Sequence, residues 1–181
     1  PYYEEPGIVI YLGDCREILP LLPDKSVDLV LTDPPYGISH PTDYRSRGRG
    51  ALAVCSDYPA VFGDDEPFDP SALLAWPCCL FGGNYYSDRL PISSGWLVWD
   101  KMRPELLDQA TAELAWTNFV KGGRVFRYLW NGMIRAGGEV LVHPTQKPVA
   151  LMKWILSLRW TPMGTVCDPY MGAGSTLVAA K

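Results

Sequence analysis

The sequence has few of the residues on which metal-binding, secreted and membrane proteins depend. Its 2 histidines have no cysteine or second histidine at ligand spacing, so we predict no metal site. Its 5 cysteines form no C-x-x-C pair, which favours reduced thiols in a cytoplasmic protein over a disulfide framework. No apolar run is long enough to cross a bilayer, so we expect no membrane partner.

Basic residues are also scarce. The 16 Lys and Arg are outnumbered by 20 Asp and Glu, and the net charge of −4 argues against a protein that holds nucleic acid by bulk electrostatics. The net charge does not exclude local basic patches on the surface. The 181 residues and 48% hydrophobic content indicate one globular domain over residues 1–181. Because the chain opens at Pro1 and ends at Lys181 just inside a predicted helix, we interpret it as a fragment or as a protein whose termini are not included.

The turn Asp33-Pro34-Pro35-Tyr36 organises the chain. It follows an apolar run at residues 27–32 that predicts a buried strand, and two prolines in succession must end that strand. Ligands bind at the carboxyl ends of strands in open α/β sheets. A carboxylate, a rigid carbonyl and an aromatic ring suit a planar ring that bears an amino group. Taken alone, the four residues fit a purely structural turn equally well.

A second turn, residues 168–176, settles the choice. An apolar strand at 165–167 leads to Asp168, and Gly172 and Gly174 then permit positive φ and close approach of a ligand before a helix begins at Ser175. The free N–H groups of that helix start favour a carboxylate or another anion. The third glycine of the dinucleotide fingerprint is missing, so the pattern is weak support for NAD.

With the hexapeptide H-P-T-Q-K-P at residues 143–148, these turns resemble the β-class, permuted DNA amino-methyltransferases, in which D-P-P-Y precedes the glycine motif. The resemblance covers nearly the whole chain and implies that Asp33, Pro34, Pro35 and Tyr36 are catalytic. It also implies the cofactor S-adenosylmethionine, bound by Asp14, His143, Thr145, Lys147, Asp168, Pro169, Tyr170, Gly172, Gly174, Ser175 and Thr176. From propensity alone, Asp14 is a helix N-cap, and the two roles are compatible.

The resemblance implies an α/β fold: a Rossmann-like, mostly parallel sheet with one reversed strand and helices on both faces. We expect strands at residues 8–12, 78–81 and 95–101 and helices at 15–22, 70–76 and 149–160, the last with Pro148 in its first position. The first strand and helix should form a β-α-β unit with residues 27–32. Residues 113–119 and 125–130 flank a Gly-Gly turn and predict an antiparallel hairpin at one edge.

Family members continue past the glycine helix into a strand whose acidic end binds the ribose. This chain stops at Lys181, so we expect the C-terminal cofactor strand to be missing, with a gap between the strands of Tyr11 and Cys167.

Double-stranded DNA is the expected partner, and a homodimer is left open. The polar loop at residues 38–67 carries Arg45, Arg47 and Arg49 directly after the catalytic turn, where they would clamp phosphates; a solvated loop is the alternative. Lys121 and Arg124 near the hairpin tip are either phosphate contacts or an ordinary solvated turn. Asn84, in a G-G-N-Y turn, is placed at the base pocket by the resemblance.

The expected reaction is direct transfer to an exocyclic amine on a flipped base stacked on Tyr36. D-P-P-Y favours N6 of adenine over N4 of cytosine, which stays the alternative. We reject C5-cytosine methylation because Cys78 lacks the glutamine of a P-C-Q setting. Methylation of RNA or of a protein glutamine, and a non-catalytic remnant that binds DNA or a partner, are the rivals. Restriction, phage and orphan roles are not distinguished.

Overall fold

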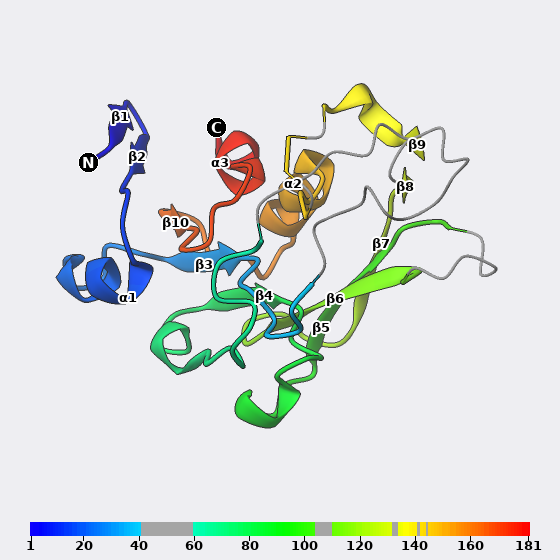
Figure 1. Ribbon diagram of the computed structural model, residues 1–181, viewed down its shortest axis with the longest axis horizontal. Helices are drawn as coiled ribbons and strands as arrows, with labels where there is room; N and C mark the ends of the chain where they lie inside the picture. Colours follow the sequence, from blue (N-terminus) through cyan, green and yellow to red (C-terminus); the bar gives the residue numbers. More distant parts are fainter. Residues whose placement is uncertain (41–59, 104–109, 132–133, 141, 144) are drawn as a thin grey trace.

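A six-stranded sheet forms the centre of the molecule, in the order β10-β3-β4-β6-β5-β7 (Figure 1). The computed structural model describes residues 1–40, 60–103, 110–131, 134–140, 142–143 and 145–181. The strands are β3 (Leu29–Thr32), β4 (Cys78–Phe81), β5 (Gly95–Asp100), β6 (Ala112–Thr117), β7 (Arg124–Arg127) and β10 (Val166–Cys167). Only β6 is reversed in this sheet; it pairs antiparallel with β4 and β5, and the remaining pairs are parallel. The predicted Rossmann-like, mostly parallel sheet is confirmed.

Helices and short helical turns cover both faces of the sheet. On one face, α2 (Val149–Ser157) buries Leu151, Met152 and Ile155 against β3, β4, β5 and β6, and α3 (Ser175–Ala180) packs beside it. The other face is covered by α1 (Cys15–Ile18) and by the 3-10 turns η1 (Leu19–Leu21), η2 (Ser71–Leu73) and η3 (Ser87–Arg89). Because β3 and β4 are buried along their whole length, they are continuous apolar runs rather than alternating ones.

The amino-terminal strand corrects one prediction. β2 (Ile8–Ile10) pairs antiparallel with β1 (Tyr3–Glu5) in a separate two-stranded sheet, so it forms no β-α-β unit with β3. Its side chains explain the difference, because Val9 and the following Tyr11 are about half exposed and could not be central in a sheet covered on both faces. The Lys181 ammonium is 2.8 Å from a Glu5 carboxylate oxygen, and α3 lies between this hairpin and α2 (Figure 1).

The predicted hairpin of residues 113–119 and 125–130 is also wrong in its pairing. β6 and β7 lie on opposite sides of β5, and the antiparallel neighbours are β5 and β6. The chain between β6 and β7 passes over Gly95, where a Cβ would lie 2.3 Å from the carbonyl oxygen of Val120. A glycine at the start of β5 therefore allows the crossing that carries β7 to the outer edge.

Smaller differences concern the helices. The predicted helix at 70–76 is the single turn η2, and Pro148 precedes α2 as its N-cap residue rather than occupying the first helical position. A further small sheet pairs β8 (Trp130–Asn131) with β9 (Ile134–Arg135), followed by the 3-10 turn η4 (Ala136–Gly138). No helix among the described residues is long and apolar enough to cross a membrane.

Candidate active site

Asp33 lies directly after β3, at the edge of the sheet where the parallel strands end, inside a cluster of alternating charges. Its Oδ2 accepts from the ammonium of Lys147, a residue 114 positions later. The same ammonium lies 3.2 Å from Oε2 of Glu113 on β6, and Oε1 of Glu113 pairs with Lys101 after β5. Side-chain exposure is 18% for Asp33 and 6% for Lys147. Three strands and the segment before α2 thus bring two carboxylates and two ammonium groups together.

Burial and ion pairing compete in this cluster. Burial raises the pKa of Asp33, and the Lys147 ammonium opposes that effect only in part. Burial alone would lower the pKa of Lys147, but the carboxylates of Asp33 and Glu113 hold it above its ordinary value. Burial would likewise raise the pKa of Glu113, whereas the two lysines lower it to about 2. Lys147 and Glu113 are therefore charged at neutral pH, and Lys147 is the group that favours the ionised form of Asp33.

Glu113 Oε2 is buried and makes no hydrogen bond among the described residues, although it lies close to the Lys147 ammonium. At 3.2 Å the two groups form an ion pair.

Tyr36 is the second residue that binds the Asp33 carboxylate. Its hydroxyl donates to Oδ1 of Asp33 at 2.5 Å, so both carboxylate oxygens are occupied. Burial raises the pKa of Tyr36 well above its ordinary value, and the Asp33 carboxylate adds to the effect, so the hydroxyl keeps its proton. The ring contacts the backbone of Gly82, where a Cβ would be 2.1 Å from the ring, and it stacks with the ring of Tyr85.

Asp64 fixes the backbone that follows the turn at residues 33–36. Its Oδ1 accepts from the N–H groups of Tyr36 and Gly37, both at 2.9 Å, and its Oδ2 accepts from that of His40 at 2.6 Å. The side chain of Asp64 is buried. The described ends of the loop at 38–67 are therefore tied together.

Thr32 connects the turn at residues 33–36 to the glycine turn. Its hydroxyl donates to Oδ1 of Asp168 at 2.6 Å and accepts from the N–H of Tyr170 at 3.1 Å. Burial raises the pKa of Asp168 to about 6, against the hydrogen bonds of Thr32 and Thr176, which lower it. Positive φ is confirmed at Gly172 (51°) and Gly174 (75°).

Within the hexapeptide at 143–148, Lys147 contacts both turns. Ser175 donates from Oγ to the carbonyl oxygen of Lys147 at 2.7 Å, which joins the start of α3 to the hexapeptide. Thr145 lies beside His143, 3.1 Å from Oγ1 to Nδ1, and burial lowers the pKa of His143 against the opposing charge of Asp33. Since Lys147 pairs with Asp33, its predicted contact with the cofactor stays a prediction, as do those of His143 and Thr145.

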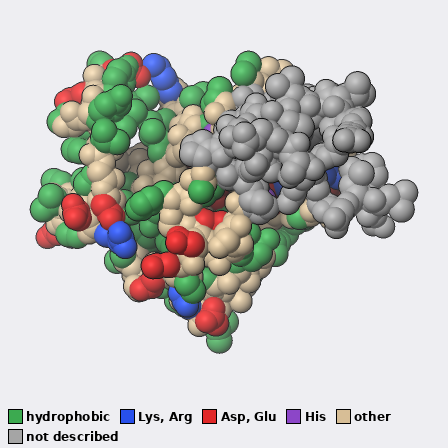
Figure 2. Space-filling model, in the orientation of Figure 1, with side chains coloured by type: hydrophobic (Ala, Val, Ile, Leu, Met, Phe, Trp, Pro, Cys, Tyr) green, Lys and Arg blue, Asp and Glu red, His purple; other side chains and the backbone are tan. Residues whose placement is uncertain are grey.

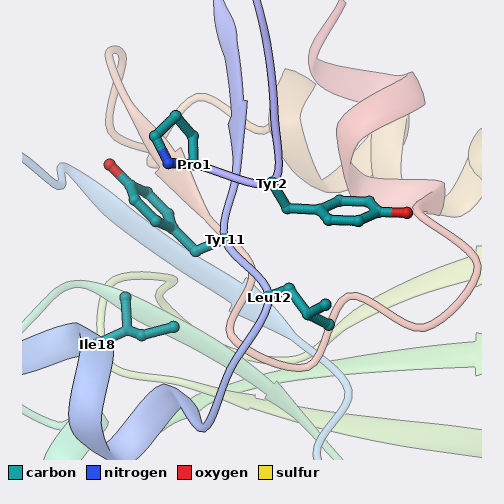
Figure 3. Close-up of a pocket in the computed structure, with 5 residues that line it drawn as sticks. All are labelled: Pro1, Tyr2, Tyr11, Leu12 and Ile18. Carbon is teal, nitrogen blue, oxygen red and sulfur yellow. The ribbon is translucent and has the colours of Figure 1, made fainter.

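Asp14 is the N-cap of α1, as propensity predicted, and it accepts from the N–H of Arg16 at 2.9 Å. The guanidinium of Arg16 lowers the pKa of Asp14 to about 2. A cavity of about 380 Å³ lies beside it, lined by Pro1, Tyr2, Tyr11, Leu12 and Ile18. Figure 3 shows Tyr11 and Ile18 on one side of this cavity and Tyr2 and Leu12 on the other. Its lining suits an apolar, planar group.

A second cavity, about 660 Å³, lies over β5, β6 and β7 and includes Asp100, Arg103 and Arg127 in its lining. Neither cavity contains Asp33, whose carboxylate is already held by Lys147 and Tyr36, so the site is recognised by its chemistry rather than by an empty volume.

The predicted DNA-contacting residues do not lie together in the structure. Arg45, Arg47 and Arg49 lie outside the described residues. Asn84 is exposed and follows β4 at the same edge as Asp33, but Lys121 and Arg124 lie where β7 starts, at the opposite edge of the sheet. The Arg124 guanidinium covers the ring of Trp160, at 4.6 Å from its centre. On the face shown in Figure 2, the described Lys and Arg side chains are scattered among acidic ones.

The structure agrees with the rejection of a cysteine nucleophile. Cys78 and Cys79 are fully buried within β4, and burial raises the pKa of the Cys78 thiol to about 12. A thiolate is the reactive form of cysteine, so neither residue is suited to attack a base.

The sequence analysis did not identify Thr32, Asp64 and Glu113 as residues of the site. The sequence pattern could have drawn attention to Glu113, because a lone acidic residue in an apolar strand needs a polar partner when the strand is covered on both faces. The pattern does not identify that partner.

Comparisons with known proteins agree with this geometry. Residues 94–181 match the DNA methylase family model, whose name covers N6 and N4 methyltransferases. The chain is similar to DNA methyltransferases. It is 22% identical over 225 residues to the type II methyltransferase M2.LlaDCHI of Lactococcus lactis subsp. cremoris, with 100% of this chain and 83% of the relative covered. It is also 22% identical over 233 residues to the type II methyltransferase M.ScaI of Streptomyces caespitosus, with 100% and 76% covered.

A solved structure supports the fold. The M1.HpyAVI–SAM complex superimposes with a TM-score of 0.51 at 21% sequence identity, and the match covers 93% of this chain and 85% of that one. The two chains thus share the Rossmann-like fold.

Proposed function

We propose that this chain transfers a methyl group from S-adenosylmethionine to N6 of adenine in double-stranded DNA, acting on a base turned out of the helix. The observation that carries the proposal is the Asp33 carboxylate at the end of β3, bound by Lys147 and Tyr36. The preceding residue, Thr32, donates its hydroxyl to Asp168 at the start of the glycine turn, so the two turns lie side by side. A DNA substrate is supported by the DNA methylase match and the type II relatives. The D-P-P-Y turn favours adenine.

The residues present fit the cofactor. A Cβ added at Gly174 would meet no atom within 4 Å, so a ligand can approach that backbone closely. The apolar cavity beside Asp14 suits an adenine ring. The holding residues would be Asp14, His143, Thr145, Lys147, Asp168, Pro169, Tyr170, Gly172, Gly174, Ser175 and Thr176. When bound, S-adenosylmethionine supplies an electrophilic methyl group on its sulfonium.

The residues of the D-P-P-Y turn orient the target amine. The lone pair of that amine is shared with the ring, which makes it a poor nucleophile. The Asp33 carboxylate and the Pro34 carbonyl would each accept one of its hydrogens, which favours a pyramidal nitrogen with its lone pair directed at the methyl group. The Lys147 ammonium favours the ionised form of Asp33, which this task requires. Orientation supplies much of the rate enhancement, and no covalent enzyme intermediate is needed.

Methyl-labelled S-adenosylmethionine, unmethylated genomic DNA and mass spectrometry of the digested nucleosides test the proposal. We expect label on N6-methyladenine, and we expect Asp33→Ala to abolish the label while cofactor binding is retained. Label on N4-methylcytosine would support the alternative that the family model's name leaves open. Absence of label from both bases, or loss of cofactor binding together with transfer in Asp33→Ala, would contradict the assigned role.

A further inference from the structure

The ammonium of Lys147 lies between two carboxylates but donates a hydrogen bond to only one of them. It donates to Oδ2 of Asp33, while Oε2 of Glu113 lies 3.2 Å away on another side. Its further contacts, with the Tyr36 hydroxyl and the Thr145 carbonyl oxygen, are both long at 3.5 Å. An ammonium group has three hydrogens to donate, so a turn of its N–H bonds can exchange one carboxylate for the other.

Oε2 of Glu113 is a buried acceptor without a hydrogen-bond donor in the part of the chain that the structure describes. The other oxygen of this carboxylate, Oε1, is paired with Lys101, whose side chain is 12% exposed. A buried charged acceptor that makes no hydrogen bond is costly, so we expect Oε2 to have a donor in another state of the protein. The Lys147 ammonium, already at ion-pair distance, is a donor within reach.

The proposed reaction creates such a state, because it brings a third donor to Asp33. In the free protein the Tyr36 hydroxyl donates to Oδ1 and the Lys147 ammonium donates to Oδ2. The exocyclic amine of the base is neutral, and a neutral donor competes poorly with the charge-assisted bond from an ammonium. Oδ2 can accept the amine at full strength only if the ammonium donates elsewhere.

We propose that Glu113 is a positioning residue: it accepts a hydrogen bond from Lys147 when the target amine binds, and so leaves Oδ2 of Asp33 to the amine. This inference rests on the proposed function. The ammonium has to turn rather than move away, so its positive charge remains beside Asp33 throughout. No proton is transferred, and the ammonium groups of Lys101 and Lys147 still balance the two carboxylates.

Two effects of Glu113 can be separated by experiment. As an acceptor, it frees Asp33 in the complex with DNA. As a negative charge, it raises the pKa of Asp33 in the free protein, in the same direction as burial and against the Lys147 ammonium and the Tyr36 hydroxyl. The other titratable groups that interact electrostatically with Asp33 are Tyr86, His143 and Asp168. Replacing Glu113 alone by Gln should therefore lower the pKa of Asp33.

Steady-state methylation of genomic DNA by Glu113→Gln across the pH range tests the inference. An amide must turn its N–H₂ toward one of the two ammonium groups, so it cannot accept from both lysines. We expect kcat to fall by about 10- to 100-fold, which corresponds to the loss of one hydrogen bond to a charged group. The acidic limb of kcat/KM should at the same time move to lower pH, because Asp33 stays ionised further into acid. The affinity for S-adenosylmethionine should be unchanged.

Three further variants serve as comparisons. Glu113→Asp keeps the charge on a shorter side chain, so it should recover part of kcat and keep its acidic limb near that of the wild type. Lys101→Met breaks the other ion pair of Glu113 and should lower the Tm about as much as Glu113→Gln, but it should retain more kcat and leave the acidic limb in place. Glu4→Gln, the same change at an exposed position of β1, should have no effect.

A kcat of Glu113→Gln equal to that of the wild type would overturn the inference. So would a fall in kcat without the shift of the acidic limb, or an equal fall in Lys101→Met. In each of these cases an active wild type leaves the proposed function intact. A wild type that labels no base would overturn the proposed function and the role of Glu113 with it.

Discussion

Asp33 and Asp168 hold the same place in two neighbouring parallel strands, since each follows its strand and precedes a proline. Their surroundings differ in charge. Asp33 is bound by an ammonium group and a tyrosine hydroxyl, whereas Asp168 is bound by the hydroxyl of Thr32 and the N–H of Tyr170. Burial raises the pKa of both, but only Asp33 has a buried cation to oppose it.

The difference in partners between Asp33 and Asp168 shows that the same Asp-Pro sequence can serve two purposes. A carboxylate that accepts hydrogens from an amine must be ionised at working pH, and an adjacent ammonium favours that state. A carboxyl group that shapes a glycine turn needs only hydrogen bonds, which it can make in either protonation state. The letters Asp-Pro do not distinguish the two uses; the partners do.

Replacing Lys147 by Met would leave Asp33, like Asp168, without a buried cation beside it. Of the variants considered, we expect this one to have the largest effect on stability and on methylation. Removing one partner of a buried ion pair should lower the free energy of unfolding by about 3–5 kcal/mol. Loss of the cation raises the pKa of Asp33 further, so methylation at neutral pH should fall at least about 100-fold and recover in part as the pH rises. A pH–rate profile measures this.

Lys153→Met is the control, because Lys153 lies exposed on α2. A Lys147→Met enzyme with the pH profile of the wild type would show that Asp33 does not depend on this cation.

Asp168→Asn tests the other half of the comparison. The pKa of Asp168 is about 6 in the folded protein and near its ordinary value of about 4 when unfolded. Between these values the folded state holds the extra proton, so wild-type stability falls as the pH rises from about 4 to about 6, by about 3 kcal/mol. Asp168→Asn has no carboxyl group at this position, so its free energy of unfolding should not show this decrease. Urea unfolding across the pH range should show the stability of the variant rising relative to that of the wild type as the pH increases from about 4 to about 6.

Thr32→Val sharpens the same test. The Thr32 hydroxyl lowers the pKa of Asp168 in the folded protein, so its removal should extend the loss of stability to higher pH, while the loss still begins near pH 4. A constant difference between Asp168→Asn and wild type at every pH would contradict the raised pKa.

The sequence predicts what is encoded locally. The prolines after β3 and the glycines before α3 restrict the backbone directly, so both turns and the strands before them were found. Pairing over long distances is not encoded in this way. The contact of Lys147 with Asp33 spans 114 positions, and Glu113 joins them only because β6 is reversed between β4 and β5.

The hairpin prediction failed for a related reason. A Gly-Gly turn shows that the chain reverses direction, but it does not show whether the two strands become neighbours. The neighbour of β7 is β5, and the crossing depends on the missing side chain of Gly95.

Asp64 adds a third carboxylate to the comparison, and its variants should have the smallest effect. The turn after Asp33 is held from outside by Asp64, whereas the turn after Asp168 is closed by its own backbone, from the N–H of Gly174 to the carbonyl oxygen of Met171 at 2.9 Å. Asp64→Asn turns an amide N–H₂ toward a backbone N–H and leaves that donor unsatisfied. The free energy of unfolding should fall by about 1–2 kcal/mol.

Because Asp64 holds only the first turn, Asp64→Asn should slow methyl transfer several-fold and leave the affinity for S-adenosylmethionine unchanged. Asp65→Asn, a change in the exposed neighbour, is the control for charge. Single-turnover rates and equilibrium cofactor binding separate the two outcomes. If both fell together, the two turns would behave as one mechanical unit through Thr32, and the difference between Asp33 and Asp168 would be one of charge alone.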